Sequence, residues 1–521
     1  MSSGPILALP EFFALKSKSN GKYLRYEPNA NGTLEFSGDK IVSPFVKFRA
    51  EAVAHRQAGG GGSTTMYNLS CCYNNKYWRK ASQPGSLISG GADAPEEDTS
   101  KWACTLFKAE FEGKGVVRFL HAQSNSYLGR GSEPGQSGFD RLVVGRRVQA
   151  EVCEVVDYSE SVVLLPKLVA FKGDNDKYLK HASIHVFPPA PLSFGTPGFF
   201  GINPILPPID TSYWVNAVQF SVDTIEDLSA AHQVFVNPSD ATIRIQSVAT
   251  GNFWRRDATH GDWIRCDSTD ATFDNKDTVF QVVRVAESGN SDNVQITLKN
   301  CGNGLFCKRF WDSDIGSCLR ASAQHMDGYS YLVVKEPVKH RRIFDVDIRS
   351  GDARTVTVST MKNPEIDIFP NGTSTPRKVT SKLVVTETTT ATWSSTMTWK
   401  IGGKLTLDFK IPGSGFLDKF LKGAKLELSG EYSEGATKGG TNTTTKTKEI
   451  VEDYTVPPMK QVRLSLEERT TTREVPFSYS YTDKLYNDEE AVTYRLEDGL
   501  FTSTTTKEVI VPIEEPLEMK T

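Results

Sequence analysis

The sequence predicts an all-β protein built from three successive domains. Three observations support this prediction: a hairpin-like unit recurs six times, the last third of the chain is rich in Thr and Ser, and one segment there alternates apolar and polar residues. The chain of 521 residues is too long for a single hydrophobic core, because domains typically contain about 100–200 residues. Several β-rich domains in tandem are therefore expected.

The recurring unit consists of a short apolar strand, a tight Asn- or Gly-containing turn and an aromatic strand, which is typical of a β-hairpin. One hairpin cannot bury its apolar face alone, whereas three can share a core around a pseudo-threefold axis. The six units thus predict two tandem β-trefoil domains, at residues 1–157 and 163–337. The recurring aromatic residues are expected mainly in these cores; they are Tyr23, Tyr77, Tyr127, Tyr178, Phe253 and Phe306.

Residues 341–521 are predicted to form a third, elongated β-sheet domain. Threonine is β-branched and favours strands over helices, and it occurs here in runs such as 386–390, 441–445 and 502–506. Strands that are polar on both faces specify their pairing register only weakly. Such strands suit a β-barrel whose wall must refold.

A membrane-insertion hairpin is predicted at about residues 399–434. Its two halves, 401–411 and 424–434, alternate apolar and polar residues, and their length matches the ~9–11 residues of a tilted transmembrane strand. An open strand edge is not tolerated in lipid, so several copies of the chain would each contribute two strands. An ordinary amphipathic hairpin of a soluble sheet is the alternative. The apolar residues assigned to this hairpin and its tip are Ile401, Leu405, Leu407, Phe409, Ile411, Phe416, Leu417, Phe420, Leu421, Leu426, Leu428 and Tyr432.

Composition excludes several other classes. A net charge of −3 gives no reason to expect a nucleic-acid partner, since such proteins usually carry a basic surface. Neither a secretory signal nor an apolar run of ~20 residues is present, so a cytoplasmic, possibly nucleocytoplasmic, location is expected. The eight cysteines form no CxxC pair and are interpreted mostly as buried thiols. No metal or cofactor is predicted.

No catalytic residue is predicted either. The chain contains neither H-E-x-x-H nor G-x-S-x-G. The run Gly59–Gly62 lacks the following Lys-Ser/Thr of a phosphate-binding loop. The sequence is therefore interpreted as that of a protein that is not an enzyme, and a carbohydrate-active enzyme is kept only as an unfavoured alternative.

Several motifs in the first two thirds of the chain resemble those of one lectin family. They include Trp102-Ala103-Cys104-Thr105-Leu106-Phe107-Lys108, Phe36-Ser37-Gly38-Asp39-Lys40-Ile41 and Asp262-Trp263-Ile264. Over roughly residues 8–337 the chain resembles a tandem pair of amaranthin-type agglutinin domains. This resemblance implies two β-trefoils that bind galactose/N-acetylgalactosamine-type glycans.

The candidate sugar-binding residues combine flat rings with amide and hydroxyl groups. In the agglutinin family an Asn-plus-aromatic cluster lies just before the Trp102 motif, and the aligned stretch here, residues 84–88, lacks the aromatic residues. A sugar needs a ring for its apolar face and polar groups for its hydroxyls, although each such residue is alternatively part of a core. On this basis the candidates are Asn75, Tyr77, Trp78, Ser86, Asn252 and Trp254.

The last third resembles the aerolysin-type pore-forming module, on the pattern of Thr/Ser-rich strands that bracket an amphipathic hairpin. The two resemblances together imply a plant defence or stress lectin that targets a glycan-bearing membrane, forms a homo-oligomer and inserts a β-barrel pore. A multivalent lectin whose third domain serves only for oligomerisation is the alternative.

Overall fold

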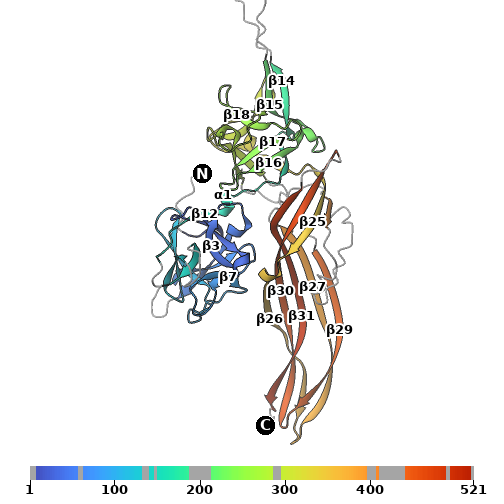
Figure 1. The fold of residues 1–521 in the computed structure, drawn as a ribbon. Coiled ribbons are helices and arrows are strands. Elements are labelled where there is room, and N and C mark those ends of the chain that lie inside the picture. The colour runs from blue at the N-terminus through green and yellow to red at the C-terminus, as the bar shows by residue number, and fades with distance from the viewer. Residues whose placement is uncertain are drawn as a thin grey trace, which may run out of the picture.

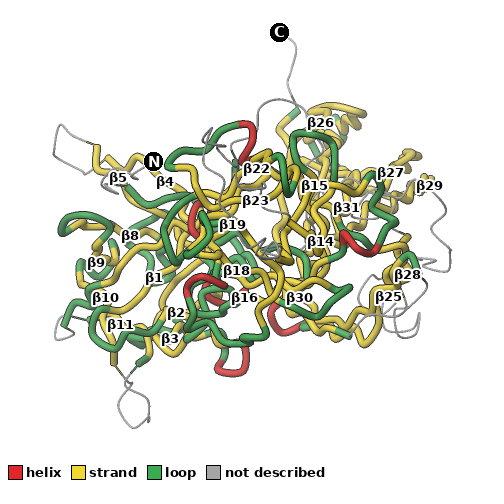
Figure 2. Tube along the Cα trace, turned by 90° about the horizontal axis from the view of Figure 1, so that it is seen from above, coloured by secondary structure: helices red, strands yellow, loops and turns green. Residues whose placement is uncertain are grey.

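The protein is nearly all β, as the sequence predicts, and its strands form three sheets in chain order (Figure 1). The tube view shows strands and loops throughout, with only short helical segments (Figure 2). The computed structural model describes residues 8–56, 63–131, 140–145, 149–186, 213–285, 295–395, 406–409, 441–487 and 493–517. Among these residues the helical segments are η1 (Pro28–Ala30), η2 (Pro44–Val46), α1 (Tyr158–Ser161), η3 (Leu228–Ala230), η4 (Lys276–Thr278), η5 (Gly328–Ser330) and η6 (Ser350–Asp352).

The first sheet contains twelve strands. They are β1 (Phe12–Ser17), β2 (Tyr23–Glu27), β3 (Thr33–Gly38), β4 (Phe48–Arg56), β5 (Ser63–Cys71), β6 (Tyr77–Lys80), β7 (Ile88–Ala92), β8 (Leu106–Phe111), β9 (Val116–His121), β10 (Ser126–Gly131), β11 (Arg141–Val144) and β12 (Cys153–Asp157). Strands β1, β4, β5, β8, β9 and β12 pair in that order, and β12 pairs back to β1, so they close a ring. The hairpins β2–β3, β6–β7 and β10–β11 join one another, which is the threefold arrangement that the repeats predict.

The second sheet repeats this plan with twelve further strands. They are β13 (Leu168–Lys172), β14 (Tyr178–Val186), β15 (Tyr213–Val222), β16 (His232–Val236), β17 (Ile243–Ser247), β18 (Phe253–Asp257), β19 (Trp263–Ser268), β20 (Phe280–Arg284), β21 (Gln295–Asn300), β22 (Phe306–Asp312), β23 (Gly316–Ala323) and β24 (Leu332–Lys335). Strands β13, β16, β17, β20, β21 and β24 close the ring. The hairpins β14–β15, β18–β19 and β22–β23 pair with each other.

A β-bulge at the start of the hairpin strand explains the repeated aromatic motif. The pairing register shifts directly after the aromatic residue in five of the six units, and a bulge bends its strand and re-aims the next side chain. That next residue then lies fully inside the domain core. The residues in this position are Leu24, Trp78, Leu179, Trp254 and Cys307, all at 0% exposure.

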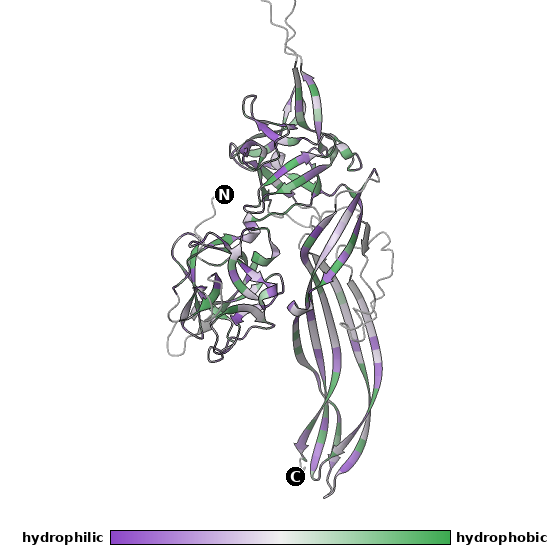
Figure 3. Ribbon diagram, in the orientation of Figure 1, coloured by the Kyte–Doolittle hydropathy of each residue, from purple (hydrophilic) through white to green (hydrophobic). Residues whose placement is uncertain are grey.

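The third sheet has much longer strands; it runs beside the first domain and extends beyond it (Figure 1). Its strands are β25 (Val338–Ile348), β26 (Arg354–Asn371), β27 (Arg377–Ser395), β28 (Thr406–Phe409), β29 (Thr441–Val456), β30 (Lys460–Leu485) and β31 (Tyr494–Pro516). The order is β28-β25-β30-β31-β27-β29, and β26 also pairs with β30. In Figure 3 hydrophilic and hydrophobic residues alternate along these strands. In the described part of this sheet the buried apolar residues form small clusters around Phe477 and around Leu464, and Val338 and Leu485 pack with Leu168 of the second domain.

The eight cysteines are all free, and six of them are buried, which confirms their interpretation as mostly buried thiols. Burial raises the pKa of the Cys72 thiol to about 12, and burial also raises the pKa of Cys307. Thiols that stay protonated are poor nucleophiles. They therefore act as small apolar core residues.

The core position defined by the bulge gives the first prediction. Replacing Trp254 by Ala should lower the free energy of unfolding of the second domain by about 3–5 kcal/mol, because the ring is fully buried. Replacing Trp311, which is 66% exposed, should change it by less than about 0.5 kcal/mol. Urea unfolding followed by circular dichroism tests both variants, and equal effects would contradict the assignment.

Candidate functional site

Three of the four sugar-binding candidates of the first domain, Asn75, Tyr77 and Trp78, lie at one turn. Asn75 has a positive φ of 56°, and its N–H donates to the carbonyl of Cys71 at 2.8 Å. Tyr77 opens the next strand, is 6% exposed and donates from its hydroxyl to Glu51 at 2.9 Å. Asn75 thus closes the turn that positions Tyr77, and the tyrosine hydroxyl is already hydrogen-bonded.

Trp78 and Trp254 cannot be sugar-binding residues, because both are buried. Both are 0% exposed, and the ring of Trp78 packs edge-on against Phe48 while that of Trp254 packs against His232. A ring without exposed surface has no face to offer a sugar. The expectation is corrected because the bulge directs these side chains into the core.

Ser86 and Asn252 lie on separate parts of the surface. The carbonyl of Ser86 accepts from the N–H of Val144 at 2.8 Å. The carbonyl of Asn252 accepts from the N–H of Ser247 at 2.9 Å in a hairpin turn of the second domain. Both side chains are partly exposed. The six candidates therefore do not converge on one site within a single chain.

The third sheet docks on the first domain beside Tyr77. The Arg354 guanidinium lies over the Tyr77 ring, 5.4 Å from its centroid, and Arg354 Nε donates to the Asp93 carbonyl at 2.7 Å. Thr355 N donates to Asp93 Oδ2 at 3.3 Å. This contact covers part of the surface where Tyr77 was expected to meet a sugar.

A buried acid completes the contact. Asp352, in η6, is 9% exposed and accepts from the hydroxyl of Tyr26 at 2.5 Å. Burial raises the pKa of Asp352, against the opposing effects of the Tyr26 hydrogen bond and the nearby Arg349. Burial and the bond to Asp352 raise the pKa of Tyr26 as well. The pair fixes the short loop between β25 and β26 on the first domain.

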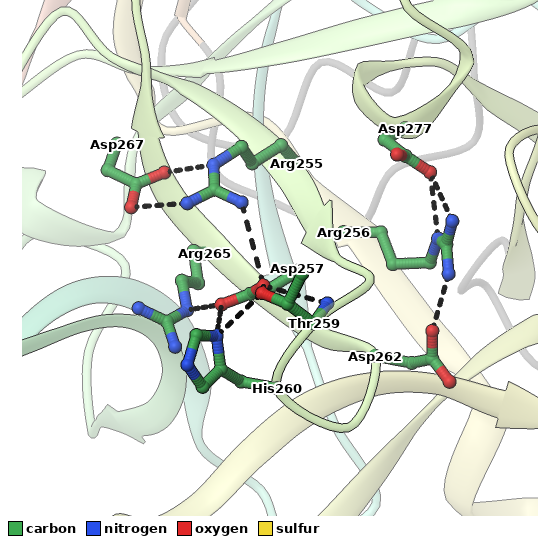
Figure 4. A network of polar contacts seen from close by, with 9 residues as sticks. All are labelled: Arg255, Arg256, Asp257, Thr259, His260, Asp262, Arg265, Asp267 and Asp277. Carbon is green, nitrogen blue, oxygen red and sulfur yellow. Dashed lines mark hydrogen bonds and ion pairs between the residues drawn. The ribbon is translucent and has the colours of Figure 1, made fainter.

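A dense network of charged residues organises the β18–β19 hairpin of the second domain (Figure 4). Arg255 makes two bonds to Asp267, at 2.6 and 3.0 Å. Arg256 donates to Asp277 and to Asp262, at 2.8 and 2.5 Å. These bonds tie both strands and η4 together and hold the turn that precedes Trp263.

Asp257 is the buried centre of this network, at 4% exposure. Arg265 Nε lies 2.6 Å from its Oδ2 atom, Thr259 Oγ1 donates to its Oδ1 atom at 2.8 Å, and His260 Nδ1 lies 3.0 Å from Oδ2. Burial by itself raises the pKa of Asp257, but the Thr259 bond and the Arg265 charge outweigh it, so the pKa is lowered. A glycosidase general acid needs a raised pKa, so the arrangement favours a structural role.

Threonine pairs cross the middle of the third sheet. Hydroxyl pairs join Thr389 to Thr505 at 3.1 Å, Thr470 to Thr506 at 3.1 Å and Thr472 to Thr504 at 3.3 Å. Each such cross-strand pair contributes only about 0.2–1 kcal/mol. The middle of the sheet is therefore held by backbone bonds and polar pairs rather than by a large apolar core.

Most of the predicted insertion hairpin lies outside the described residues. Leu407 and Phe409 belong to β28, whose backbone pairs in parallel with β25. The neighbours β27 and β29 pair antiparallel, from Arg377 with Val456 to Thr392 with Thr441. The hairpin residues outside the described ranges are Ile401, Leu405, Ile411, Phe416, Leu417, Phe420, Leu421, Leu426, Leu428 and Tyr432.

The described residues contain neither a candidate metal site nor a candidate membrane-spanning helix. No group of three or more His, Cys, Asp or Glu side chains there is placed to hold a metal ion. No helix there is long and apolar enough to cross a membrane.

Comparison with known proteins identifies the first two domains. The family model described as "Agglutinin domain" matches residues 7–149 and 210–335, which together make up just over half of the chain. The chain belongs to the agglutinin-domain family. The first match covers β1 to β11 and the second covers β15 to β24, so the agglutinin resemblance seen in the motifs is confirmed and the first two domains are those of a lectin family.

Other comparisons add little to the agglutinin assignment. No curated protein matches the sequence. The solved structure described as "Structure and mode of action of a mosquitocidal holotoxin" matches with 10% identity and a TM-score of 0.25. The match covers 66% of this chain and only 37% of that one. At this score the likeness carries no argument.

Sequence reasoning missed both the Asp352–Tyr26 contact and the Asp257 network. The charge-rich run Arg255-Arg256-Asp257 and the isolated Asp352 are visible in the sequence. Their partners are not: Asp277 is twenty-one positions from Arg256, and Tyr26 is 326 positions from Asp352. Only a pairing signal between distant positions would have revealed them.

The network predicts a specific acid sensitivity. Because the folded-state pKa of Asp257 lies below that of an unfolded aspartate, its stabilisation is full above about pH 5 and is lost as the pH falls through the folded-state value. Asp257→Asn should lower the free energy of unfolding by about 1–3 kcal/mol at pH 7. It should also reduce the loss of stability that occurs as the pH falls. Thermal unfolding from pH 7 to pH 2.5 tests this, with the exposed Asp314→Asn as control. A parallel acid limb in the variant would contradict the role.

The docking contact predicts a mobile third sheet when Arg354 is lost. Arg354→Ala removes the bond to Asp93 and the contact with Tyr77, and should weaken docking by about 1–3 kcal/mol. The variant should show a larger radius of gyration in small-angle scattering and faster chymotrypsin cleavage. Lys378→Ala, on an exposed position of the same sheet, should change neither, and an unchanged Arg354 variant would refute the contact.

Proposed function

We propose that this agglutinin-family lectin attaches to galactose/N-acetylgalactosamine-type glycans on a membrane, oligomerises, and inserts a β-barrel pore. The observation that carries the proposal is the register of β27 and β29. These strands lie side by side and antiparallel, with Thr392 opposite Thr441. The segment between them, residues 396–440, therefore leaves and returns at one end of the sheet, as a hairpin that extends two existing strands must do.

The amphipathic pattern of that segment supports insertion. Its two halves have the length and the alternation of transmembrane strands, and they continue β27 and β29 in sequence. Part of it, β28, pairs with β25 in the described backbone. On insertion this short pairing would be given up, and the hairpin would form two strands of a barrel shared with other copies.

The third sheet has the low apolar content that such a change requires. Its middle is joined by threonine hydroxyl pairs, and the side chains of β29 are largely exposed at the edge of the sheet. An exposed edge strand is a template for pairing with another chain. The edge therefore offers a route to the homo-oligomer.

The lectin domains would supply the targeting step. Two sugar-binding domains per chain, multiplied by oligomerisation, raise avidity without new contacts. The chain is proposed to be made in the cytoplasm, possibly with access to the nucleus, and to meet its membrane after release from the cell.

A second candidate is a multivalent lectin whose third domain only joins copies. The same exposed β29 edge favours it, because edge pairing needs no membrane. In both candidates the binding of glycans is the common activity, and no catalytic step is involved.

Dye release separates the two candidates. The wild-type chain should release dye from liposomes that carry galactose-terminated glycolipid, with a steep concentration dependence. Leu405→Asp places a charge on the predicted lipid face and should reduce release at least tenfold, while Thr406→Asp, on the predicted polar face, should retain it.

Each outcome of this assay has a distinct meaning. Release by both variants would show that the hairpin is assigned wrongly. If the wild-type protein binds these liposomes but never releases dye, the multivalent lectin is the supported function. Binding of both variants to immobilised glycan is the control for folding.

A further inference from the structure

Exposed aromatic rings gather at one place in the second domain. Among the part of the chain that the structure describes, the large aromatic side chains with the greatest exposure are Trp311 at 66%, Tyr329 at 55% and Phe310 at 41%. Phe310 and Trp311 lie on β22, and Tyr329 lies in η5, which packs next to that strand. The other strongly exposed apolar residues are aliphatic or Met side chains.

The most exposed ring, that of Trp311, lies beyond the part of the hairpin strand that the core uses. In the repeat, Cys307 of β22 takes the core position that Trp254 takes in β18. Strand β22 has seven residues where β18 has five, so Trp311 and Asp312 lie beyond the end of the equivalent strand β18. A strand end that leaves the core with a tryptophan facing solvent presents apolar surface for another purpose.

Neighbouring side chains hold the Phe310 ring in place. Phe310 packs edge-on against Trp263, with centroids 5.7 Å apart. The Arg320 guanidinium lies 5.4 Å from the Trp263 ring and 5.2 Å from the Phe310 ring, and its Nε donates to the Gly261 carbonyl at 2.6 Å. A surface fixed in this way loses little conformational entropy when a ligand binds.

A second arginine fixes the third ring. Arg309 makes two bonds to Asp174, at 2.7 and 2.6 Å, and its guanidinium lies 5.4 Å from the ring of Tyr329. At the hairpin tip Asp312 accepts from the N–H of Asp314 at 2.9 Å. Planar donors and carboxylate acceptors thus surround the rings on the same hairpin.

We infer that the tip of the β22–β23 hairpin, with Phe310, Trp311 and Tyr329, is a carbohydrate-binding surface for the pyranose ring of a neutral glycan. A pyranose has an apolar C–H face and a rim of hydroxyls, which matches exposed rings bordered by arginine donors and carboxylate acceptors. Both signs of charge are present, so a neutral polyol fits better than an anion. This inference rests on the proposed function and assigns it a site in the second domain.

The test is a glycan array of immobilised neutral mono- and oligosaccharides, probed with the full chain. We expect the wild type to bind at least one glycan class, and Trp311→Ala and Phe310→Ala/Trp311→Ala to bind that class at least tenfold more weakly. Met459→Ala, an exposed apolar residue of the third sheet, is the matched control and should bind like the wild type. Thermal unfolding checks that all variants fold.

Two results would overturn the inference. One is that both variants bind every glycan that the wild type binds, or that the wild type binds no glycan on the array. The other is unchanged glycan binding with lost adhesion to phosphatidylcholine liposomes free of glycolipid, which would make the surface a membrane contact. The proposed pore is judged separately, because Leu405→Asp tests dye release and leaves this surface intact.

Discussion

The closure of six strands into a ring is the constraint on which the first two domains depend. Each ring strand pairs on both sides, so its backbone bonds are met within the domain, and a closed ring has no edge to aggregate. The bulges in the hairpin strands then direct the next large side chain inward, toward the space that the ring encloses. The tryptophans that looked like sugar ligands are consequently the residues that fill the rings.

The third sheet follows a different physical rule. It is an open sheet with long strands, small apolar clusters in its described part and threonine pairs in its middle. Its stability therefore depends on many weak polar contacts, whereas the rings depend on buried aromatic volume. The sheet contacts the first domain through Asp352 and Arg354 and the second domain through Tyr494, whose hydroxyl accepts from Gln233 Nε2 at 3.0 Å.

Two surfaces of the first two domains differ from their counterparts in the other repeats: the one that the third sheet covers and the one that we propose binds a glycan. The contact with the third sheet covers Tyr77 in the first domain. In the second domain the lengthened β22 carries its rings beyond the core, and the Asp257 network stiffens the neighbouring hairpin that supplies Trp263. The glycan surface that we propose therefore depends on residues that differ between the repeats rather than on their shared core.

The sequence alone determined the all-β class, the sixfold hairpin repeat and the agglutinin membership, because strand alternation, turn residues and family motifs are local features. It could not separate core aromatics from exposed ones. Trp78, Trp254 and Trp311 all lie in hairpin strands with similar local sequence. Whether each ring is buried depends on a bulge or on the length of its strand. The docking of Asp352 on Tyr26 and the joining of Arg256 to Asp277 were equally hidden. These contacts exist only after distant strands pair, so the tertiary structure alone decided them.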